Sequence, residues 1–402
     1  MRIVMIGMIL ALLGGTGSAE SIDKRYATNK NCQACHRAIS RQWESSRHAH
    51  SHFTRNQLYD RTLEYMASRD LLRTKEELVV ECSKCHNPRI EKRRIDKTDK
   101  LKLLLDLDRE EVEKVLYTQT MQNGINCIVC HNVKEVHWDA NVSRRGYDAV
   151  AFGPQGVMYG PFKGAKSPYH KTEYNPIFTE DPNKLCFVCH YSDVNRHGLK
   201  VYATGEEYRS LEGDRPRCID CHMSAKKKGV ASNYGIKEGD AVVREVRDHL
   251  FASIDNSRIH KKYLKLSAEL KGDKVRITLR NDTPHKVPTG YGLRVMELQV
   301  RFIGEGERVL DEKIRRFEAR WLDEKGQPTV PHLAKKKLMD DRIPPRSSVT
   351  LEYPVPEGTR FVNYRLVYRQ ISKAMAKKLK IDDPFFTQTF LLHNGLIELP
   401  AK

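Results

Sequence analysis

The chain has 402 residues, with 70 Lys and Arg against 52 Asp and Glu, which gives a formal net charge of +18. This length is enough for two or three domains. A positive charge of this size ordinarily suggests nucleic acid or an anionic surface as the partner. No stretch beyond residue 20 approaches the roughly 18 apolar residues of a membrane span, so we do not expect stable membrane insertion.

The N-terminus reads as a secretory signal. Arg2 precedes an apolar run from Ile3 to Leu13, and small residues follow up to Gly17-Ser18-Ala19. We therefore predict a signal peptide over residues 1–19 and a mature start at Glu20. No cysteine lies near the cleavage site, which argues against a lipid anchor. The predicted location is the periplasm or the extracellular space.

All ten cysteines fall into five C-x-x-C pairs, and a histidine follows each pair directly. The five motifs are, in chain order, Cys32-Cys35-His36, Cys82-Cys85-His86, Cys127-Cys130-His131, Cys186-Cys189-His190 and Cys218-Cys221-His222. C-x-x-C-H is the attachment pattern of c-type haem. A disulfide framework, a thioredoxin-like pair and zinc sites do not account for the five histidines or for the irregular spacing between the motifs.

Five covalently bound haem c groups, each with iron, are the predicted cofactors, and each proximal histidine is an axial ligand. Every haem brings two propionates, so much of the Lys and Arg excess compensates charge inside the protein. Nucleic acid is therefore not the expected partner. The expected partners are other redox proteins, and a remaining basic surface favours an acidic one.

The sixth ligand of each iron decides between electron transfer and catalysis, because an open position admits a substrate. Eleven histidines lie outside the five motifs, more than five irons need, so two histidines on every iron are possible. Number alone does not assign the partners. We expect His332 and His393, far downstream, to have no part in ligation.

The composition changes after the fifth motif, and we predict a cytochrome domain over residues 20–261 and a β domain over residues 262–402. The first is read as short helices and long loops, with a helix from Leu101 to Gln122 that a capping box of Asp108 and Glu111 supports. Gly146 to Pro182 reads as loop. So few residues for five haems imply that the haems share walls.

Apolar and polar residues alternate in the C-terminal part. Strands are expected at Tyr263–Leu270, Lys274–Asn281, Leu293–Ile303, Val309–Trp321, Val349–Val355 and Phe361–Arg369. A short helix is expected near Ser372–Leu379. The fold class is therefore α+β: a helix-and-loop pentahaem domain followed by an antiparallel β-sandwich of immunoglobulin-like size.

Several segments resemble the multihaem cytochrome family typified by the tetrahaem electron acceptor of hydroxylamine oxidoreductase. They are Trp43 to Ala49 (W-x-x-S-x-H-A), Gly124 to Cys127 before the third motif, Tyr159 to His170, Thr204 to Met223, and Asn281 to Gly290. The last of these resembles the segment that opens a C-terminal β domain in such cytochromes. The resemblance covers most of the mature chain.

The resemblance implies that His48, His170 and His249 are distal iron ligands. We add His137, six residues after His131, and His285, with His197 and His50 in reserve.

Three functions follow from these expectations. The first is an electron carrier with two histidines on each iron, a ligation that keeps potentials low. The second is an oxidoreductase acting on a small nitrogen or sulfur compound at one open haem; the Lys proximal ligand of related nitrite reductases is absent here. The third is a structural role in which subunits, as a homo-oligomer, share haem ligands.

Overall fold

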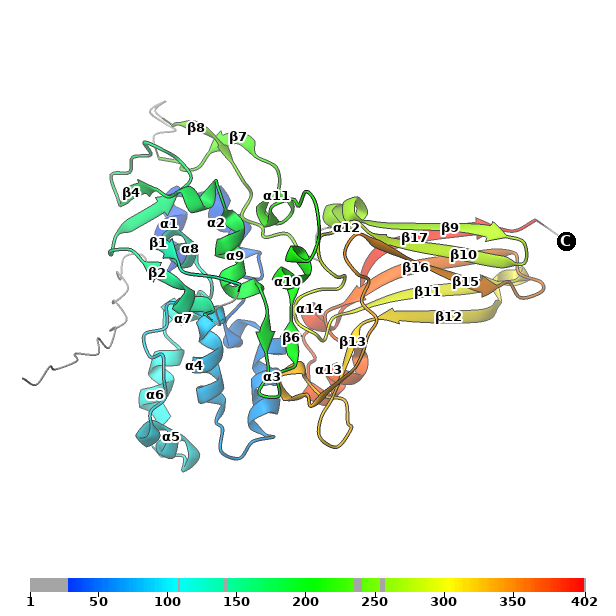
Figure 1. Ribbon diagram of the computed structural model, residues 1–402, viewed down its shortest axis with the longest axis horizontal. Coiled ribbons are helices and arrows are strands. Elements are labelled where there is room, and N and C mark those ends of the chain that lie inside the picture. Colours follow the sequence, from blue (N-terminus) through cyan, green and yellow to red (C-terminus); the bar gives the residue numbers. More distant parts are fainter. Residues whose placement is uncertain (1–27, 108, 141–143, 235–240, 254–256, 401–402) are drawn as a thin grey trace, which may run out of the picture.

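The computed structural model describes residues 28–107, 109–140, 144–234, 241–253 and 257–400 (Figure 1). The signal peptide predicted for residues 1–19 lies outside these residues, and so does Asp108 of the predicted capping box. Short helices and small strand pairs form one part of the molecule, and long strands extend from it as the other. We call residues 28–263 the five-motif part and residues 264–400 the β part.

The five-motif part consists mainly of short helices. They are α1 (Asn29–Cys35), α2 (Arg37–Glu44), α3 (Gln57–Ala67), α4 (Lys75–His86), α5 (Lys97–Leu104), α6 (Arg109–Leu116), α7 (Gln119–Gln122), α8 (Cys127–His131), α9 (Pro182–His190), α10 (Thr204–Arg209), α11 (Cys218–His222) and α12 (Ser257–Tyr263). Local signals set several boundaries. At α4, Thr74 caps the helix and Glu77 completes a capping box.

The predicted helix from Leu101 to Gln122 is divided into α5, α6 and α7. Asp106 has a left-handed backbone (φ 57°), which cannot continue an α-helix, and the Thr118 side chain caps the start of α7. The expected loop from Gly146 to Pro182 contains short strands: β2 (Val150–Phe152), β3 (Val157–Gly160) and β4 (Lys171–Tyr174). Strands β3 and β4 pair in parallel, and β2 pairs with β1 (Val133–Val136).

Three further short strand pairings occur. In the five-motif part β5 (Asp193–Val194) pairs with β6 (Lys200–Tyr202), and β7 (Lys227–Val230) with β8 (Val243–Val246). In the β part β13 (Ala319–Leu322) pairs with β14 (Lys336–Asp340).

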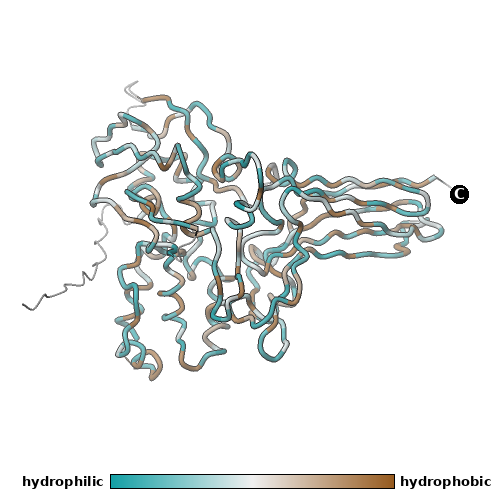
Figure 2. Tube along the Cα trace, in the orientation of Figure 1, coloured by the Kyte–Doolittle hydropathy of each residue, from teal (hydrophilic) through white to brown (hydrophobic). Residues whose placement is uncertain are grey.

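Two antiparallel sheets dominate the β part. One has the order β15 (Ser347–Pro354), β10 (Lys274–Asn281), β9 (Leu264–Lys271). The other has the order β12 (Val309–Phe317), β11 (Val295–Ile303), β16 (Phe361–Arg369), β17 (Phe390–Glu398). Apolar and polar residues alternate along these strands (Figure 2), and the buried set from both sheets forms one core, including Ile277, Leu298 and Leu366. The α+β class is confirmed, and most expected strands lie within two residues of their predicted bounds.

Sequence patterning missed β14 and β17, and it merged β12 with β13. The helix α13 (Lys373–Leu379) begins where predicted, with Ser372 as its cap. A second short helix, α14 (Pro384–Thr387), follows it.

The two parts share a hydrophobic core. Leu63 and Met66 of α3 and Leu78 of α4 belong to one buried cluster with Val330 and Met375 of the β part. Burying each such side chain contributes roughly 1.5–3 kcal/mol, so the packing fixes the β part against α3 and α4.

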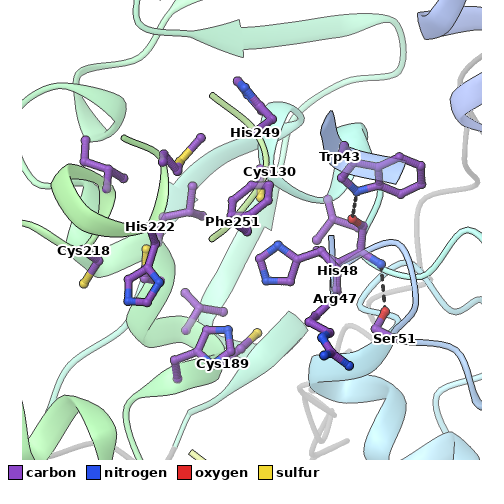
Figure 3. Close-up of a pocket in the computed structure, with 18 of the residues that line it drawn as sticks. Trp43, Arg47, His48, Ser51, Cys130, Cys189, Cys218, His222, His249 and Phe251 are labelled. Atoms are coloured by element: carbon purple, nitrogen blue, oxygen red, sulfur yellow. Dashed lines mark hydrogen bonds between the residues drawn. The ribbon is translucent and has the colours of Figure 1, made fainter. Parts of the chain in front are cut away.

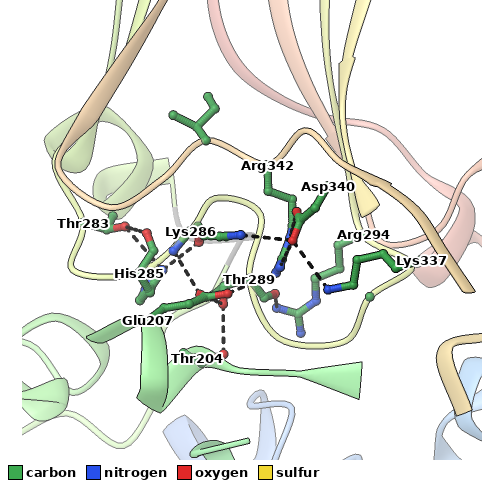
Figure 4. A network of polar contacts seen from close by, with 12 residues as sticks. Thr204, Glu207, Thr283, His285, Lys286, Thr289, Arg294, Lys337, Asp340 and Arg342 are labelled. Atoms are coloured by element: carbon green, nitrogen blue, oxygen red, sulfur yellow. Dashed lines mark hydrogen bonds and ion pairs between the residues drawn. The ribbon is translucent and has the colours of Figure 1, made fainter. Parts of the chain in front are cut away.

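A polar network adds to this interface (Figure 4). The Glu207 carboxylate of α10 accepts hydrogen bonds from the Lys286 backbone N–H (3.0 Å) and from the Thr289 hydroxyl (2.9 Å). Arg342 lies 3.4 Å from Glu207 and binds Asp340 through two nitrogens. The segment around Lys286 is therefore held firmly against α10.

Candidate haem centres

Each C-x-x-C pair lies on one helical turn. The motifs occupy α1, the end of α4, α8, the end of α9 and α11, and each histidine stands at or just after the last helical residue. With 3.6 residues per turn, positions three apart lie on the same face, so both thiols of a pair point to one side. None of the ten cysteines is paired in a disulfide.

One cavity of about 2500 Å³ collects all five motifs. Pockets for single drug-sized ligands measure about 300–1,000 Å³, so this space suits several large groups together. All five motif histidines line it, as do His48, His170, His249 and His285 from outside the motifs. The cavity and its lining therefore fit a set of adjacent haems.

Four of the five motif histidines donate Nδ1–H to a backbone carbonyl. The bonds are His36 to Ala231 (2.7 Å), His86 to Ser51 (3.2 Å), His131 to Tyr159 (2.8 Å) and His222 to Ala252 (2.8 Å). A proton held at Nδ1 leaves the Nε2 lone pair free for a metal.

Four of the five motif histidines, all except His86, face a second histidine ring across the cavity. The ring centres are separated by 6.4 Å for His36 and His170, 6.1 Å for His190 and His48, 6.3 Å for His131 and His249, and 6.5 Å for His222 and His285. A ligating nitrogen stands about 2 Å from a first-row metal and about 1 Å from its ring centre, so two imidazoles across one metal have centres about 6 Å apart. Each pair is spaced for one iron.

Three of the four facing histidines also hold their proton at Nδ1. The acceptors are the carbonyls of Lys171 for His170 (3.4 Å), Arg247 for His249 (3.2 Å) and Lys286 for His285 (2.9 Å). The exception is His48, whose Nδ1 is buried without a partner. Burial, reinforced by neighbouring histidines, lowers the pKa of His48 to about 3 and those of His190, His249 and His285 to about 4. These rings are neutral near pH 7, as metal ligands must be.

The segment that precedes the third motif fixes the backbone at His48, whose ring faces His190 of the fourth motif. Trp43 Nε1 donates to the Ile125 carbonyl (2.7 Å; Figure 3). Ile125 N donates to the His48 carbonyl (3.0 Å). Gly124 makes this contact possible, since a Cβ there would lie 2.7 Å from the His48 oxygen, and its φ is +58°.

His249 is held by a separate set of contacts. Gln42 accepts from the His249 backbone N–H (2.9 Å) and donates to Asp248 (3.1 Å). Ser224 donates to the same carboxylate (2.8 Å). Phe251, two residues on, lies between His48 and His249, with ring centres 4.3 and 6.0 Å away (Figure 3). Sequence reasoning gave Phe251 no role.

His285 belongs to the loop between β10 and β11. The buried Asn281 side chain donates to the His285 carbonyl (2.9 Å) and to the Pro344 carbonyl (2.8 Å). The resemblance in this segment thus coincides with a tightly held loop that carries a histidine from the β part into the cavity.

His137 is not brought opposite any motif ring among the described residues. Its backbone N–H donates to Ala149 (2.8 Å) at the end of the β1–β2 pair, and its side chain is 44% exposed, 3.7 Å from Glu135. The strand pairing therefore holds His137 beside Glu135. The reserve histidines also lie elsewhere: the His50 ring bonds the Glu44 carbonyl (3.2 Å), and His197 lies beside Arg196.

The second motif differs from the other four. Among described residues, no histidine ring faces His86 at a spacing like those above. The Tyr59 ring stacks on His86 instead, with centres 4.2 Å apart and planes at 14°. Two residues of the β part, Tyr291 and His332, line the cavity nearby. Burial, His86 and Arg73 lower the pKa of His332 to about 4.

Contacts between sulfur atoms show which motifs are neighbours. Cys32 of the first motif interacts electrostatically with Cys127 of the third, and Cys186 of the fourth interacts with Cys218 of the fifth. Cys189 of the fourth motif reaches Cys85 of the second. The fourth motif therefore lies beside both the second and the fifth.

Five C-x-x-C-H motifs in one shared cavity, four of them with a histidine that faces a second histidine, indicate a multihaem c-type cytochrome, an electron-transfer protein that binds haem c. In agreement, residues 31–132 match the family model described as cytochrome c554 and c-prime. No curated protein sequence matches the chain significantly.

Among solved structures, the chain is similar to a penta-haem cytochrome c552 from Thermochromatium tepidum. The TM-score is 0.69 at 20% sequence identity, and the match covers 92% of this chain and 98% of that one. At this identity the likeness establishes the fold. No helix in the described ranges is long and apolar enough to cross a membrane.

Proposed function

We propose that the protein is an exported pentahaem cytochrome that transfers electrons between redox partners. The observation that carries the proposal is the spacing of the four histidine pairs, 6.1–6.5 Å between ring centres. Two histidines on one iron leave no position for a substrate, and such an iron cycles between Fe(III) and Fe(II) without binding one. Each of the five motifs is assigned one covalent haem.

The sulfur contacts support an electron path with a branch. The first motif adjoins the third, and the thiol of Cys130 in the third interacts with Cys186 and Cys189 of the fourth. From the fourth motif, Cys189 leads to the second and Cys186 to the fifth. In this proposal electrons that enter at the first haem reach the fourth by way of the third.

Partners are proposed to be other redox proteins of the periplasm or the cell exterior. The formal charge of +18 falls when haem propionates are included, and the remaining basic surface suits an acidic partner. Association with such a partner is expected to slow as ionic strength rises. Nucleic acid is not proposed as a partner, and the β part serves as a docking or homo-oligomer surface in this proposal.

The test consists of two measurements. The first is the intact mass of the exported protein, and the second is a quantitative EPR spectrum of its oxidised form. The mass is expected to show five covalent haems and cleavage before Glu20. At least four haems are expected as low-spin Fe(III). Fewer than four low-spin haems would overturn the pairing of the histidines, and a mass with fewer than five haems would overturn the count.

A further inference from the structure

The first motif lies at one end of the proposed electron path, where it adjoins the third. Its helices α1 and α2 lie away from the β part (Figure 1). The hydrogen bond that His170, the partner of His36, donates to Lys171 is exposed, whereas the corresponding bonds of His249 and His285 are partly buried. Of these three sites, the first is therefore the most open to a partner protein.

Three cationic side chains surround the first motif. Lys30, Arg37 and Arg41 are exposed and line one surface hollow of about 320 Å³, and we call them the α1–α2 cations. Gln33 and Ala34, the two residues between the cysteines of the motif, complete the hollow. Positions 30, 34, 37 and 41 are three or four residues apart, which is the spacing of one helical face. Ala34 also lines the haem cavity, so the hollow and the cavity adjoin.

The charge of the α1–α2 cations is not compensated within the part of the chain that the structure describes. No carboxylate lines the hollow, and none of the described carboxylates forms an ion pair with these three side chains. Strand β7 shows the contrast, because its basic residues are paired. Lys226 lies 3.8 Å from Glu245, and Lys227 lies 2.5 Å from Asp248. The hollow therefore presents positive charge that the described chain leaves available.

The propionates of the first haem do not supply this charge either. Vinyl groups and propionates occupy opposite edges of a haem, and a C-x-x-C turn attaches the vinyl edge. The α1–α2 cations lie at that turn, so the propionates of the first haem point away from them. The positive charge consequently faces solvent beside the haem edge that is bound to the chain.

We propose that the α1–α2 cations form the docking surface through which an acidic redox protein exchanges electrons with the first haem. This inference rests on the function proposed above, because it gives the partner of that function a place. Arg37 and Arg41 carry planar guanidinium groups, which bind carboxylates through two parallel hydrogen bonds. Opposite charges also raise the rate of association by about 10–10³-fold. In the transfer the partner loses one electron as Fe(III) of the first haem becomes Fe(II), and no bond forms or breaks.

The test is stopped-flow reduction of the complete haem-loaded protein by a reduced plant-type [2Fe–2S] ferredoxin, a small acidic one-electron donor of low potential. The variant is Lys30→Glu with Arg41→Glu, and Arg37 stays unaltered because it follows the proximal ligand His36. The second-order rate constant is expected to fall about tenfold at low ionic strength. The difference from the unaltered protein should shrink as salt is added, because salt screens exposed charges.

The matched control is Arg308→Glu with Lys325→Glu. Both residues are exposed in the β part, and the change in net charge is the same. The control is expected to change the rate constant by less than about twofold. A small uncharged reductant, photoreduced lumiflavin, should reduce both variants as fast as the unaltered protein, since it needs no charged docking surface.

An unchanged rate in the first variant, or equal slowing in the two variants, would overturn this inference. Either result leaves the electron-transfer proposal intact, because ferredoxin still reduces the haems. Failure of ferredoxin and lumiflavin alike to reduce the unaltered protein would contradict the proposed function instead.

A second measurement uses the unaltered protein and decides the question even if the first variant does not fold. Carbodiimide joins lysine side chains to carboxylates of docked ferredoxin, and mass spectrometry identifies the residues that are joined. Lys30 is the expected site of the cross-link. Cross-links that leave out Lys30 would overturn the inference.

Discussion

The ring of Phe251 packs edge-on against the ring of His48, with 4.3 Å between the ring centres. Phe251 follows His249 by two residues, so one short segment supplies the histidine that faces His131 and shields the histidine that faces His190. The left-handed backbone of Phe251 (φ 46°) makes this double placement possible. The histidines that face the third and the fourth motif are therefore linked through one short segment.

Replacing Phe251 by Ala is expected to lower the reduction potential of the fourth haem. Loss of the ring admits water to His48, and water stabilises the more highly charged Fe(III) form. A shift on the order of 30 mV is expected, about half of the 59 mV that corresponds to a tenfold change for one electron. Spectroelectrochemical titration measures it. Phe390→Leu in the β part is the control, and equal titrations of the two variants would contradict the role given to Phe251.

Replacing His170 by Ala is expected to open the first haem. His170 is the ring that faces His36, and its loss leaves the iron without a sixth protein ligand. One low-spin EPR component should disappear and one high-spin component should appear. His137→Gln serves as the control because that side chain lies beside Glu135. A spectral change in His137→Gln, with none in His170→Ala, would reinstate the spacing-based prediction for His137.

Gly124→Ala is expected to disturb the fourth haem although Gly124 belongs to the third motif's segment. The added Cβ would lie 2.7 Å from the carbonyl oxygen of His48, in a backbone conformation with φ +58°. The expected cost is about 2–3 kcal/mol, of which the left-handed conformation alone accounts for about 1–2 kcal/mol. Thermal unfolding and EPR measure the two effects.

Gly272→Ala provides the comparison, because Gly272 has a similar φ of +63° with nothing near its added Cβ. Gly272→Ala is expected to lower the free energy of unfolding only by the cost of the left-handed conformation. Its EPR spectrum is expected to stay unchanged. Equal losses in the two variants would show that the contact with His48 is unimportant.

Asp340 makes the interface between the two parts sensitive to acid. Burial alone would raise its pKa, but Arg342 and Lys286 hold the pKa of Asp340 well below its usual range. A lowered folded-state pKa stabilises the protein above the unfolded value of about 3.9, and that stability is lost as pH falls below it. Asp340→Asn is expected to cost about 3 kcal/mol at pH 7, because it leaves buried cations without their partner.

The stability of the unaltered protein should therefore decline between about pH 5 and pH 2, and Asp340→Asn should lack part of that decline. Chemical denaturation at several pH values measures both slopes. Asp311→Asn, on exposed strand β12, should change stability at pH 7 by less than about 0.5 kcal/mol. Identical pH slopes for the unaltered protein and Asp340→Asn would contradict the assignment.

The sequence predicted correctly those features that depend on a short stretch of chain. The C-x-x-C-H motifs need only one helical turn, and alternating residues predicted β10 and β16 close to their observed bounds. The resemblance, and not spacing, directed attention to His48, His170 and His249. Spacing by itself suggested His137, whose position in the structure is set by the pairing of β1 with β2.

The second motif depends on contacts that no local pattern encodes. His332 approaches His86 only because Val330 and Met375 pack in one core with Leu63 and Leu78. His332 was expected to have no role since it lies far beyond the last motif. The helix expected over Leu101–Gln122 is divided for local reasons, the left-handed residue Asp106 at the first break and the cap Thr118 at the second.

The central claim is that four irons lie between named histidine pairs and one does not. An anomalous difference map at the iron edge, from a crystal of the haem-loaded protein, tests it most directly. We predict five iron peaks, four of them about 2 Å from both Nε2 atoms of a pair. The fifth should lie that close to His86 of the second motif. A peak bonded to His137 or His332, or a motif histidine without its assigned partner, would contradict the account.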